Sequence, residues 1–342
     1  MHTPRTNYSP ALIKYLVSQN IFESEPFSLV DVGVSGDIDA YWKAFGSFRA
    51  FGFDPLVKEV ERLSALHKDD GQSFFSYLVG YKKYDQIFPP DLRNDRTRIP
   101  DTQPFGRTSS TRAQALAKVD YVRTYFDQTG AGIYATETIE LDDFFLKAHP
   151  SNVDFIKIDT DGSDYQVLLG AQALLSERQV LGIAVESQFH GLVHDAANNF
   201  SNIDRLLRGL GFSLFDLEVY RYTRAALPKP FVYGIPAQTI DGQVLWGDAL
   251  YLRDVGQERY ESTWSMSFSS GKLLKLAALF ELFGLGDCAA ELLTNYGDRL
   301  APAVDVERCL NLLTPPLRGR QLSYRQYNQV FESDTKAFFP AS

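Results

Sequence analysis

Short apolar runs alternate with stretches of helical periodicity along most of the chain. The runs are rich in β-branched and aromatic residues, which is typical of strands buried on both faces. The strand candidates are residues 27–32, 48–53, 73–79, 131–138, 153–158, 180–185, 212–217 and 249–253. Strands that alternate with helices usually form a parallel sheet with helices on its faces, so the pattern predicts an α/β fold.

Helical periodicity continues at both ends of the chain. The helix candidates are residues 11–17, 56–66, 112–126, 165–175, 203–210, 273–283, 288–296 and 304–313. The first follows Ser9 and Pro10, which stand where an N-cap and a first-turn proline are expected. We expect an N-terminal helical extension over residues 1–26, a main domain over residues 27–254 and a helical appendage over residues 255–342. The appendage would serve packing or the assembly of a homo-oligomer.

Acidic residues follow two neighbouring strand candidates. Asp159 and Asp161 come just after residues 153–158, and Glu186 ends the run at residues 180–185. Ligands of open α/β sheets gather beyond the carboxyl ends of the strands, so these side chains are candidates for a site. Asp159 and Asp161 could instead cap the helix that follows them.

A glycine turn follows the first strand candidate, with Asp31, Gly33, Ser35 and Gly36 in sequence. Glycine lets the backbone approach a ligand closely, and a helix that begins there offers free N–H groups. The alternative interpretation is a tight turn between a strand and a helix.

Asp54 follows the second strand candidate, 23 positions after Asp31. An acid near this offset binds ribose in nucleotide-binding folds, because its two oxygens can accept from two adjacent hydroxyls. The alternative is an exposed turn formed with Pro55.

Composition and charge narrow the class of protein. The chain has 342 residues and a formal net charge of −9, which argues against a sequence-independent grip on nucleic acid. Cys288 and Cys309 make neither a disulfide framework nor a zinc pattern. The amino terminus lacks an apolar core of signal-peptide length, and Lys275 and Glu281 interrupt the most apolar later stretch. We expect no membrane span and a cytoplasmic protein.

Four motifs lie at residues 138–145, 155–164 and 168–171 and in the strand that ends at Glu186. Together they resemble the FkbM-type family of class I S-adenosylmethionine-dependent methyltransferases. The resemblance implies a Rossmann-like fold with a seven-stranded, mostly parallel sheet whose last hairpin strand is antiparallel. It also implies S-adenosylmethionine as cofactor and O-methylation of a hydroxyl on a sugar, a glycan or a related secondary metabolite.

The resemblance also assigns cofactor contacts. The family's cofactor turn resembles Asp31 and Gly33 with Gly36 nearby, and its acid after the second strand resembles Asp54. The family usually has Asn in the first turn, where residues 34–36 stand here, and Glu at the positions of Asp54 and Asp161. The cofactor-binding candidates are therefore Asp31, Gly33, Ser35, Gly36, Asp54 and Asp161.

Methyl transfer to an alcohol also requires a base. The candidates for this catalytic role are Asp159, Glu186 and His190, with Asp161 beside them. We rank Asp159 first, because clustered or desolvated acids gain basicity, and His190 second, because imidazole titrates near neutral pH. Tyr220, together with Tyr222 and Phe231, is a candidate to border the acceptor or simply to pack.

Two alternatives concern metals. Asp159, Asp161 and Glu186 could together hold Mg²⁺ and acidify a bound hydroxyl, although we do not favour a metal. His190 and His194 are four positions apart, but the sequence around them lacks the context of a zinc site.

Two alternatives concern function. An NAD(P)-dependent oxidoreductase would share Asp54 and the glycine turn, but the chain lacks the G-x-G-x-x-G motif there. A non-catalytic partner protein could keep the methyltransferase fold and assemble through residues 255–342.

Overall fold

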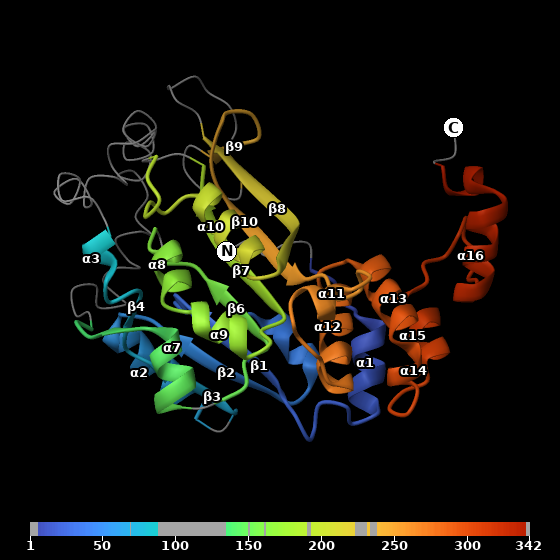
Figure 1. Ribbon diagram of the computed structural model, residues 1–342, viewed down its shortest axis with the longest axis horizontal. Helices are drawn as coiled ribbons and strands as arrows, with labels where there is room; N and C mark the ends of the chain where they lie inside the picture. The colour runs from blue at the N-terminus through green and yellow to red at the C-terminus, as the bar shows by residue number, and fades with distance from the viewer. Residues whose placement is uncertain are drawn as a thin grey trace. The chain divides into compact units, whose positions relative to one another are not determined.

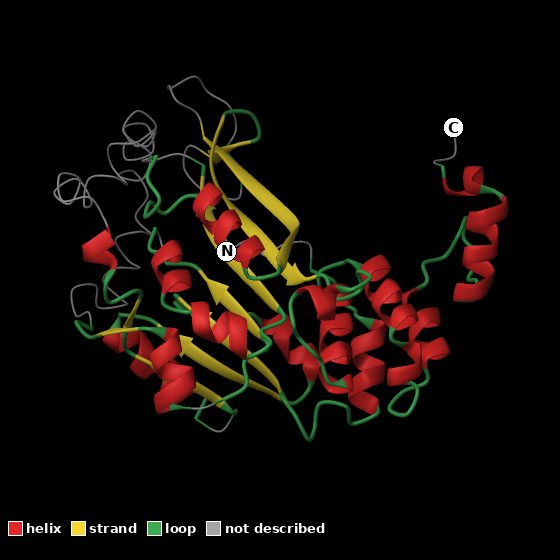
Figure 2. Cartoon of the chain, in the orientation of Figure 1, coloured by secondary structure: helices red, strands yellow, loops and turns green. Residues whose placement is uncertain are grey.

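The computed structural model describes residues 6–68, 70–87, 135–149, 151–160, 162–189, 193–222, 231–232 and 238–339. The chain divides into two compact units. The sheet unit holds Ser28–Ile38 and Arg49–Leu252, and the helical unit holds Arg5–Phe27, Asp39–Phe48 and Arg253–Ser342. Figure 2 colours the strands yellow and the helices of both units red.

The main sheet has eight strands in the part of the chain that the structure describes. Their order across the sheet is β3 (Gln72–Phe75), β2 (Phe48–Phe53), β1 (Phe27–Val32), β6 (Phe155–Ile158), β7 (Gly182–Gln188), β10 (Gln243–Arg253), β8 (Phe212–Tyr222) and β9 (Gln238–Thr239) (Figure 1). The pairs β2/β3, β1/β6 and β6/β7 are parallel, whereas β10 runs antiparallel to β7. The expected Rossmann-like α/β fold with an antiparallel last hairpin strand is confirmed, and the short β9 extends one edge.

Helices of the sheet unit pack beside these strands. They are α2 (Val57–Leu66), α3 (Tyr84–Ile87), α7 (Leu141–Asp143) with the π-helical turn η3 (Phe144–Ala148), α8 (Asp164–Leu169), α9 (Gln172–Glu177) and α10 (Phe200–Gly209). Val32, Ile158 and Val185 lie in one core cluster with apolar side chains of α8, α9 and α10. Because β1 and β6 are buried along their whole length, this core fixes the carboxyl ends of β1, β6 and β7 next to one another.

Gly170 separates α8 from α9, where the periodicity of residues 165–175 predicts one continuous helix. A Cβ at Gly170 would lie 2.3 Å from the carbonyl oxygen of Gly80, so the chain passes too close here for any other residue. The strand expected at residues 73–79 is also split. Its first part is β3, and its second part, β4 (Leu78–Val79), pairs with β5 (Thr138–Ile139) in a separate two-stranded sheet.

Two predicted elements include residues that the structure does not describe. The helix expected at residues 112–126 lies outside the described residues. So do residues 131–134 of the strand expected at residues 131–138, whose described part reaches β5 only at Thr138.

The helical unit joins segments from distant parts of the chain. Its helices are α1 (Ala11–Ser18), the 3-10 helix η1 (Ala40–Phe45), α11 (Tyr260–Thr263), α12 (Ser270–Leu282), α13 (Gly286–Asn295), α14 (Gly297–Leu300), α15 (Val306–Leu313), α16 (Tyr324–Ser333) and η4 (Thr335–Phe338). Trp42 stacks on Phe27, with ring centroids 5.4 Å apart, and meets the ring edge of Phe283 at 6.1 Å. Residues before 50 and after 253 therefore share one aromatic core.

The start of α1 differs from the expectation. Pro10 is the N-cap, and no side chain of the N-cap residue accepts a bond. The carboxylate of Glu281 in α12 instead accepts the N–H groups of Ala11, Leu12 and Ile13 at 2.7, 2.8 and 2.9 Å. A tertiary contact thus supplies the acceptor that Ser9 was expected to provide.

None of the helices in the described ranges is long and apolar enough to cross a membrane.

Candidate active site

The register of the central strands aligns acidic residues across the sheet. Ile158 of β6 is the partner of Val185 of β7, so the next positions along these parallel strands are Asp159 and Glu186. Glu186 is in turn the partner of Asp248 in β10. Directly opposite residues on paired strands point to the same face, so these three residues form a row across the carboxyl edge. We call Asp159, Glu186 and Asp248 the acid row.

Gly33 stands beside the acid row at the end of β1. Its φ is +86°, and a Cβ at this position would lie 1.8 Å from the carbonyl oxygen of Asp159. The Gly33 N–H donates to the carbonyl of Phe53 at 2.8 Å, and the Asp159 N–H donates to that of Val32 at 2.9 Å. The ends of β1, β2 and β6 thus meet at a point where only glycine fits.

Ser35 and Gly36 continue this turn and are exposed. Gly36 has a φ of +98°, and its N–H donates to Glu59 of α2 at 2.8 Å, while Arg62 donates to its carbonyl. The Arg62 guanidinium holds the pKa of Glu59 below its ordinary value, with help from the Gly36 N–H and against the effect of burial. The turn is therefore anchored to α2, yet no atom lies within 4 Å of a Cβ placed at Gly36.

Asp54 ends β2 beside Ser76, which follows β3. Phe53 and Phe75 are register partners, so Asp54 and Ser76 occupy the next positions of this parallel pair. Asp54 is only 5% exposed, and its Oδ1 accepts the Leu56 N–H at 2.7 Å. The hydroxyl oxygen of Ser76 is buried and has no hydrogen-bond partner among the described residues. Asp54 thus forms a turn that is buried rather than exposed, next to an unsatisfied hydroxyl that sequence reasoning missed.

Asp31 lies one row deeper than Gly33, within β1. It is 1% exposed, and its Oδ1 accepts from the Lys157 ammonium at 2.8 Å. Asp31 and Lys157 are also register partners on β1 and β6. The pair joins the two strands directly beneath the edge where Gly33 meets Asp159.

Asp164 organises the loop that follows Asp159. Its Oδ1 accepts from both the N–H and the hydroxyl of Thr160 at 2.9 Å, and its Oδ2 accepts from Asn198 at 3.2 Å. Burial raises the pKa of Asp164 to about 6, with a further rise from the charge of Asp159 and an opposing effect of the Thr160 bonds. No side chain caps α8 from its N-cap residue, Ser163.

Asp248 completes the acid row from the middle of β10. Tyr220 of β8 donates to its Oδ2 at 3.0 Å, while its Oδ1 is buried with no hydrogen-bond partner among the described residues. Burial raises the pKa of Asp248 to about 7; Asp159 and Glu218 add to this rise, and the Tyr220 bond opposes it. Sequence reasoning missed Asp248, although a lone acid within the apolar run of residues 244–252 was a signal.

Two predicted site residues, Asp161 and His190, lie outside the described residues. Within the described ranges, which omit both of them, no group of three or more His, Cys, Asp or Glu residues could hold a metal ion. The alternative of a Mg²⁺ site at Asp159, Asp161 and Glu186 thus has no support among the residues described.

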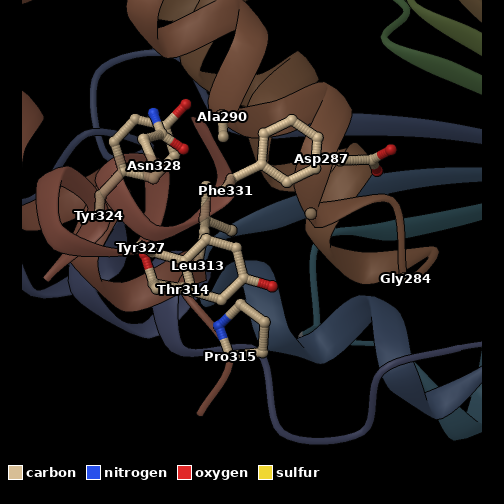
Figure 3. Close-up of a pocket in the computed structure, with 11 residues that line it drawn as sticks. Gly284, Asp287, Ala290, Leu313, Thr314, Pro315, Tyr324, Tyr327, Asn328 and Phe331 are labelled. Atoms are coloured by element: carbon tan, nitrogen blue, oxygen red, sulfur yellow. The ribbon is translucent and has the colours of Figure 1, made fainter. Parts of the chain in front are cut away.

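The helical unit contains a cavity of its own, of about 530 Å³. Tyr324, Tyr327 and Phe331 of α16 line it together with Ala290 of α13 and Leu313 of α15 (Figure 3). Its lining includes no member of the acid row.

Comparisons with known proteins give a family and several similar structures. The family model described as the methyltransferase FkbM domain matches residues 39–214. No curated protein matches the sequence. Among solved structures, the chain is similar to magnesium protoporphyrin IX methyltransferase (ChlM) from Synechocystis PCC 6803 with bound SAM, at 8% identity and a TM-score of 0.30, covering 70% of this chain and 77% of that one.

Two further structures are similar at the same level. One is a TehB-like SAM-dependent methyltransferase from Corynebacterium glutamicum, at 11% identity and a TM-score of 0.28, covering 70% of this chain and 92% of that one. The other is the N-terminal domain of EvdMO1 with SAH bound, at 10% identity and a TM-score of 0.28, covering 72% of this chain and 82% of that one.

Proposed function

The chain belongs to the FkbM methyltransferase family, and from this premise we propose that it moves a methyl group from S-adenosylmethionine to a hydroxyl of a sugar, a glycan or a related secondary metabolite. The observation that carries the proposal is the carboxyl edge of the sheet. There the Gly33 turn, Asp54, Asp159 and Glu186 lie at or near the carboxyl ends of adjacent parallel strands, and Asp248 of β10 lies opposite Glu186. This is the edge at which open α/β sheets bind ligands.

The residues present fit the nucleoside part of S-adenosylmethionine. Asp54 offers a carboxylate for the ribose hydroxyls, and Ser76 beside it has a buried hydroxyl that is unsatisfied among the described residues. A buried polar atom without a partner is costly, so a ligand that bonds to Ser76 would relieve this cost. The open space at Gly36 would receive the methionine part, to which Asp31, Gly33 and Ser35 are also assigned. Asp161 keeps its assignment from the sequence.

The charge of this edge also suits the cofactor. When bound, S-adenosylmethionine supplies an electrophilic methyl group on a positively charged sulfur. The carboxylates of Asp159 and Glu186 favour a cation at the edge they share. Those carboxylates and the bonded N–H of Gly36 disfavour a pyrophosphate, which counts against the oxidoreductase alternative.

The residues of the protein must align the acceptor hydroxyl with the methyl group and accept the proton of that hydroxyl. Among the bases predicted from the sequence, Asp159 and Glu186 lie within the described residues, and His190 follows β7 as a further candidate. Asp159 is placed closest to the cofactor turn, because its backbone contacts Gly33.

Calorimetric titration with S-adenosylhomocysteine tests the proposal, with NAD(H) and NADP(H) as controls. We expect binding of S-adenosylhomocysteine alone, and Asp54→Ala should raise its dissociation constant roughly 100-fold, since two hydrogen bonds to a charged group are lost. Asp216→Ala is the matched control, because that carboxylate also accepts a neighbouring backbone N–H and lies on β8. Binding of a nicotinamide cofactor instead would refute the methyltransferase assignment of this site.

Acceptor identity requires a second experiment. The enzyme is incubated with S-adenosylmethionine and a panel of sugars, glycosides and phenols, and methylated products are detected by mass spectrometry. A methyl ether on a sugar hydroxyl is the expected product. Methylation restricted to nitrogen or carbon acceptors would contradict O-methyl transfer.

A further inference from the structure

We propose that Asp248, held by Tyr220, is the group that receives the proton of the acceptor hydroxyl. This inference rests on the proposed function and adds a catalytic residue that follows from the strand topology. Asp248 lies in the acid row, opposite Glu186 and on the same face of the sheet. Because β10 is antiparallel, its amino-terminal half reaches the edge where the parallel strands end.

One oxygen of Asp248 is fixed, and the other is buried without a hydrogen-bond partner among the described residues. The Tyr220 hydroxyl donates to Oδ2 at 3.0 Å. Tyr220 is itself held by stacking on Trp246, with centroids 4.0 Å apart, and the Trp246 indole N–H donates to Tyr222 at 3.1 Å. These contacts orient the carboxyl group, so that Oδ1 remains without a partner among the described residues although Asp248 is only 3% exposed. An acceptor hydroxyl would satisfy this oxygen.

The groups that face Asp248 explain why its carboxyl can exchange a proton near neutral pH. Asp159 follows β6, Glu186 stands opposite on β7, and Glu218 and Tyr220 come from β8. Burial and the negative charges of Asp159 and Glu218 raise the pKa of Asp248 to about 7. A base works best when its pKa lies near the operating pH, because it is then both available and strong enough.

The transfer step moves one proton and one methyl group. Asp248 accepts the proton from the acceptor O–H bond while the acceptor oxygen forms its bond to the methyl carbon. The electron pair of the broken carbon–sulfur bond stays on sulfur, which loses its positive charge. Asp248 then releases the proton to water, so that no further reactant is needed.

The first test is kinetic, with Asp248→Asn compared to the wild-type enzyme. We expect the variant to lose roughly 100-fold to 10,000-fold in kcat, the range typical of general-base removal, while its affinity for S-adenosylhomocysteine stays within threefold of wild type. Asp248→Glu, which keeps the carboxyl group, should retain part of the activity. Wild-type kcat in Asp248→Asn would overturn the inference.

A pair of neighbouring variants separates catalysis from a structural role. Tyr220→Phe removes the bond that favours the carboxylate, so the rising limb of the pH–kcat profile should move to higher pH. Glu218→Gln removes a negative charge, so the same limb should move to lower pH. If Asp248→Asn loses activity but neither neighbour moves the profile, the loss is structural and the inference fails.

Infrared spectroscopy can follow the protonation of Asp248 without any measurement of methyl transfer. Infrared difference spectra between wild type and Asp248→Asn should show a protonated carboxyl that ionises near neutral pH. A carboxyl that is already ionised at pH 5 would overturn the role of Asp248, whatever the acceptor. Failure of the wild-type protein to bind S-adenosylhomocysteine would instead refute the proposed function itself.

Discussion

Asp142 and Asp143 are adjacent in the chain and do different work. The Asp142 carboxylate accepts the N–H groups of Leu174 and Ala173 at 2.7 and 3.1 Å, at the start of α9. Asp143 pairs with Lys147 and Lys82, which lower its pKa to about 2, but it does so at the surface. The first carboxylate replaces missing backbone partners of a helix, whereas the second forms ion pairs that water screens.

Alanine substitutions should reveal this difference. We expect Asp142→Ala to lower the free energy of unfolding by about 1–2 kcal/mol, because α9 loses its cap. Asp143→Ala is the matched control and should stay within the error of a urea titration, since exposed ion pairs contribute little. Equal losses in the two variants would contradict the capping role of Asp142.

Gly33 and Gly36 offer a second matched pair. Both have positive φ, but only Gly33 lies against backbone, the carbonyl of Asp159. Gly36→Ala should cost about 1–2 kcal/mol of unfolding free energy for its backbone conformation alone. Gly33→Ala should cost more than that and also weaken binding of S-adenosylhomocysteine, because the ends of β1 and β6 must separate. Denaturant unfolding and calorimetry measure both effects, and a milder loss at Gly33 would count against the close approach.

At the scale of the element, the positions of strands were predicted better than the close contacts between segments that are distant in the sequence. The runs at residues 27–32 and 48–53 became β1 and β2 with the same bounds. Burial on both faces leaves a continuous apolar signal in β1, whereas β2 keeps an exposed Arg49 near its start. The break at Gly170 could not be predicted, since it depends on the carbonyl of Gly80, a residue far away in the chain.

Sequence analysis identified residues of the candidate site only on the parallel strands of the sheet. Asp159 and Glu186 were found because each follows a run that ends at the ligand edge. Asp248 is the middle residue of its strand, and only the antiparallel pairing of β10 with β7 places it opposite Glu186. Ser76 was missed because a single serine after a short strand has no distinctive pattern.

The start of α1 supports a prediction at the same scale. Glu281 accepts three N–H groups of α1, so Glu281→Ala should lower the free energy of unfolding by about 2 kcal/mol. Ser9→Ala is the control and should have no effect on stability, because the Ser9 side chain does not cap the helix. Thermal and urea unfolding measure both variants, and a larger loss at Ser9 would restore the interpretation from sequence.

At the scale of the whole molecule, buried carboxyl groups set the pH dependence of stability. The pKa of Asp164 is raised to about 6 and that of Asp248 to about 7, from a reference value of 3.8. Between the reference pKa and the raised pKa of each group, the folded chain binds more protons than the unfolded chain. The free energy of unfolding therefore falls as the pH rises through this range. Glu59 has a pKa that is lowered from 4.5, so its stabilising contribution to the folded state is already complete above pH 4.5.

We therefore expect the melting temperature to decrease from pH 5 to pH 8. Asp164→Asn should flatten part of this decrease, since the amide does not ionise. Differential scanning calorimetry at several pH values measures the slope. A melting temperature that rises across this interval would show that the carboxyl groups of Asp164 and Asp248 are ionised in the folded protein.

The shared aromatic core of the helical unit has a consequence for biosynthesis. A ribosome makes Phe27 and Trp42 early, whereas Phe283 and Glu281 emerge only after the whole sheet unit has been translated. Until then α1 lacks its cap and Trp42 lacks one of its aromatic neighbours. The aromatic core of the helical unit therefore cannot be completed until Phe283 has been translated.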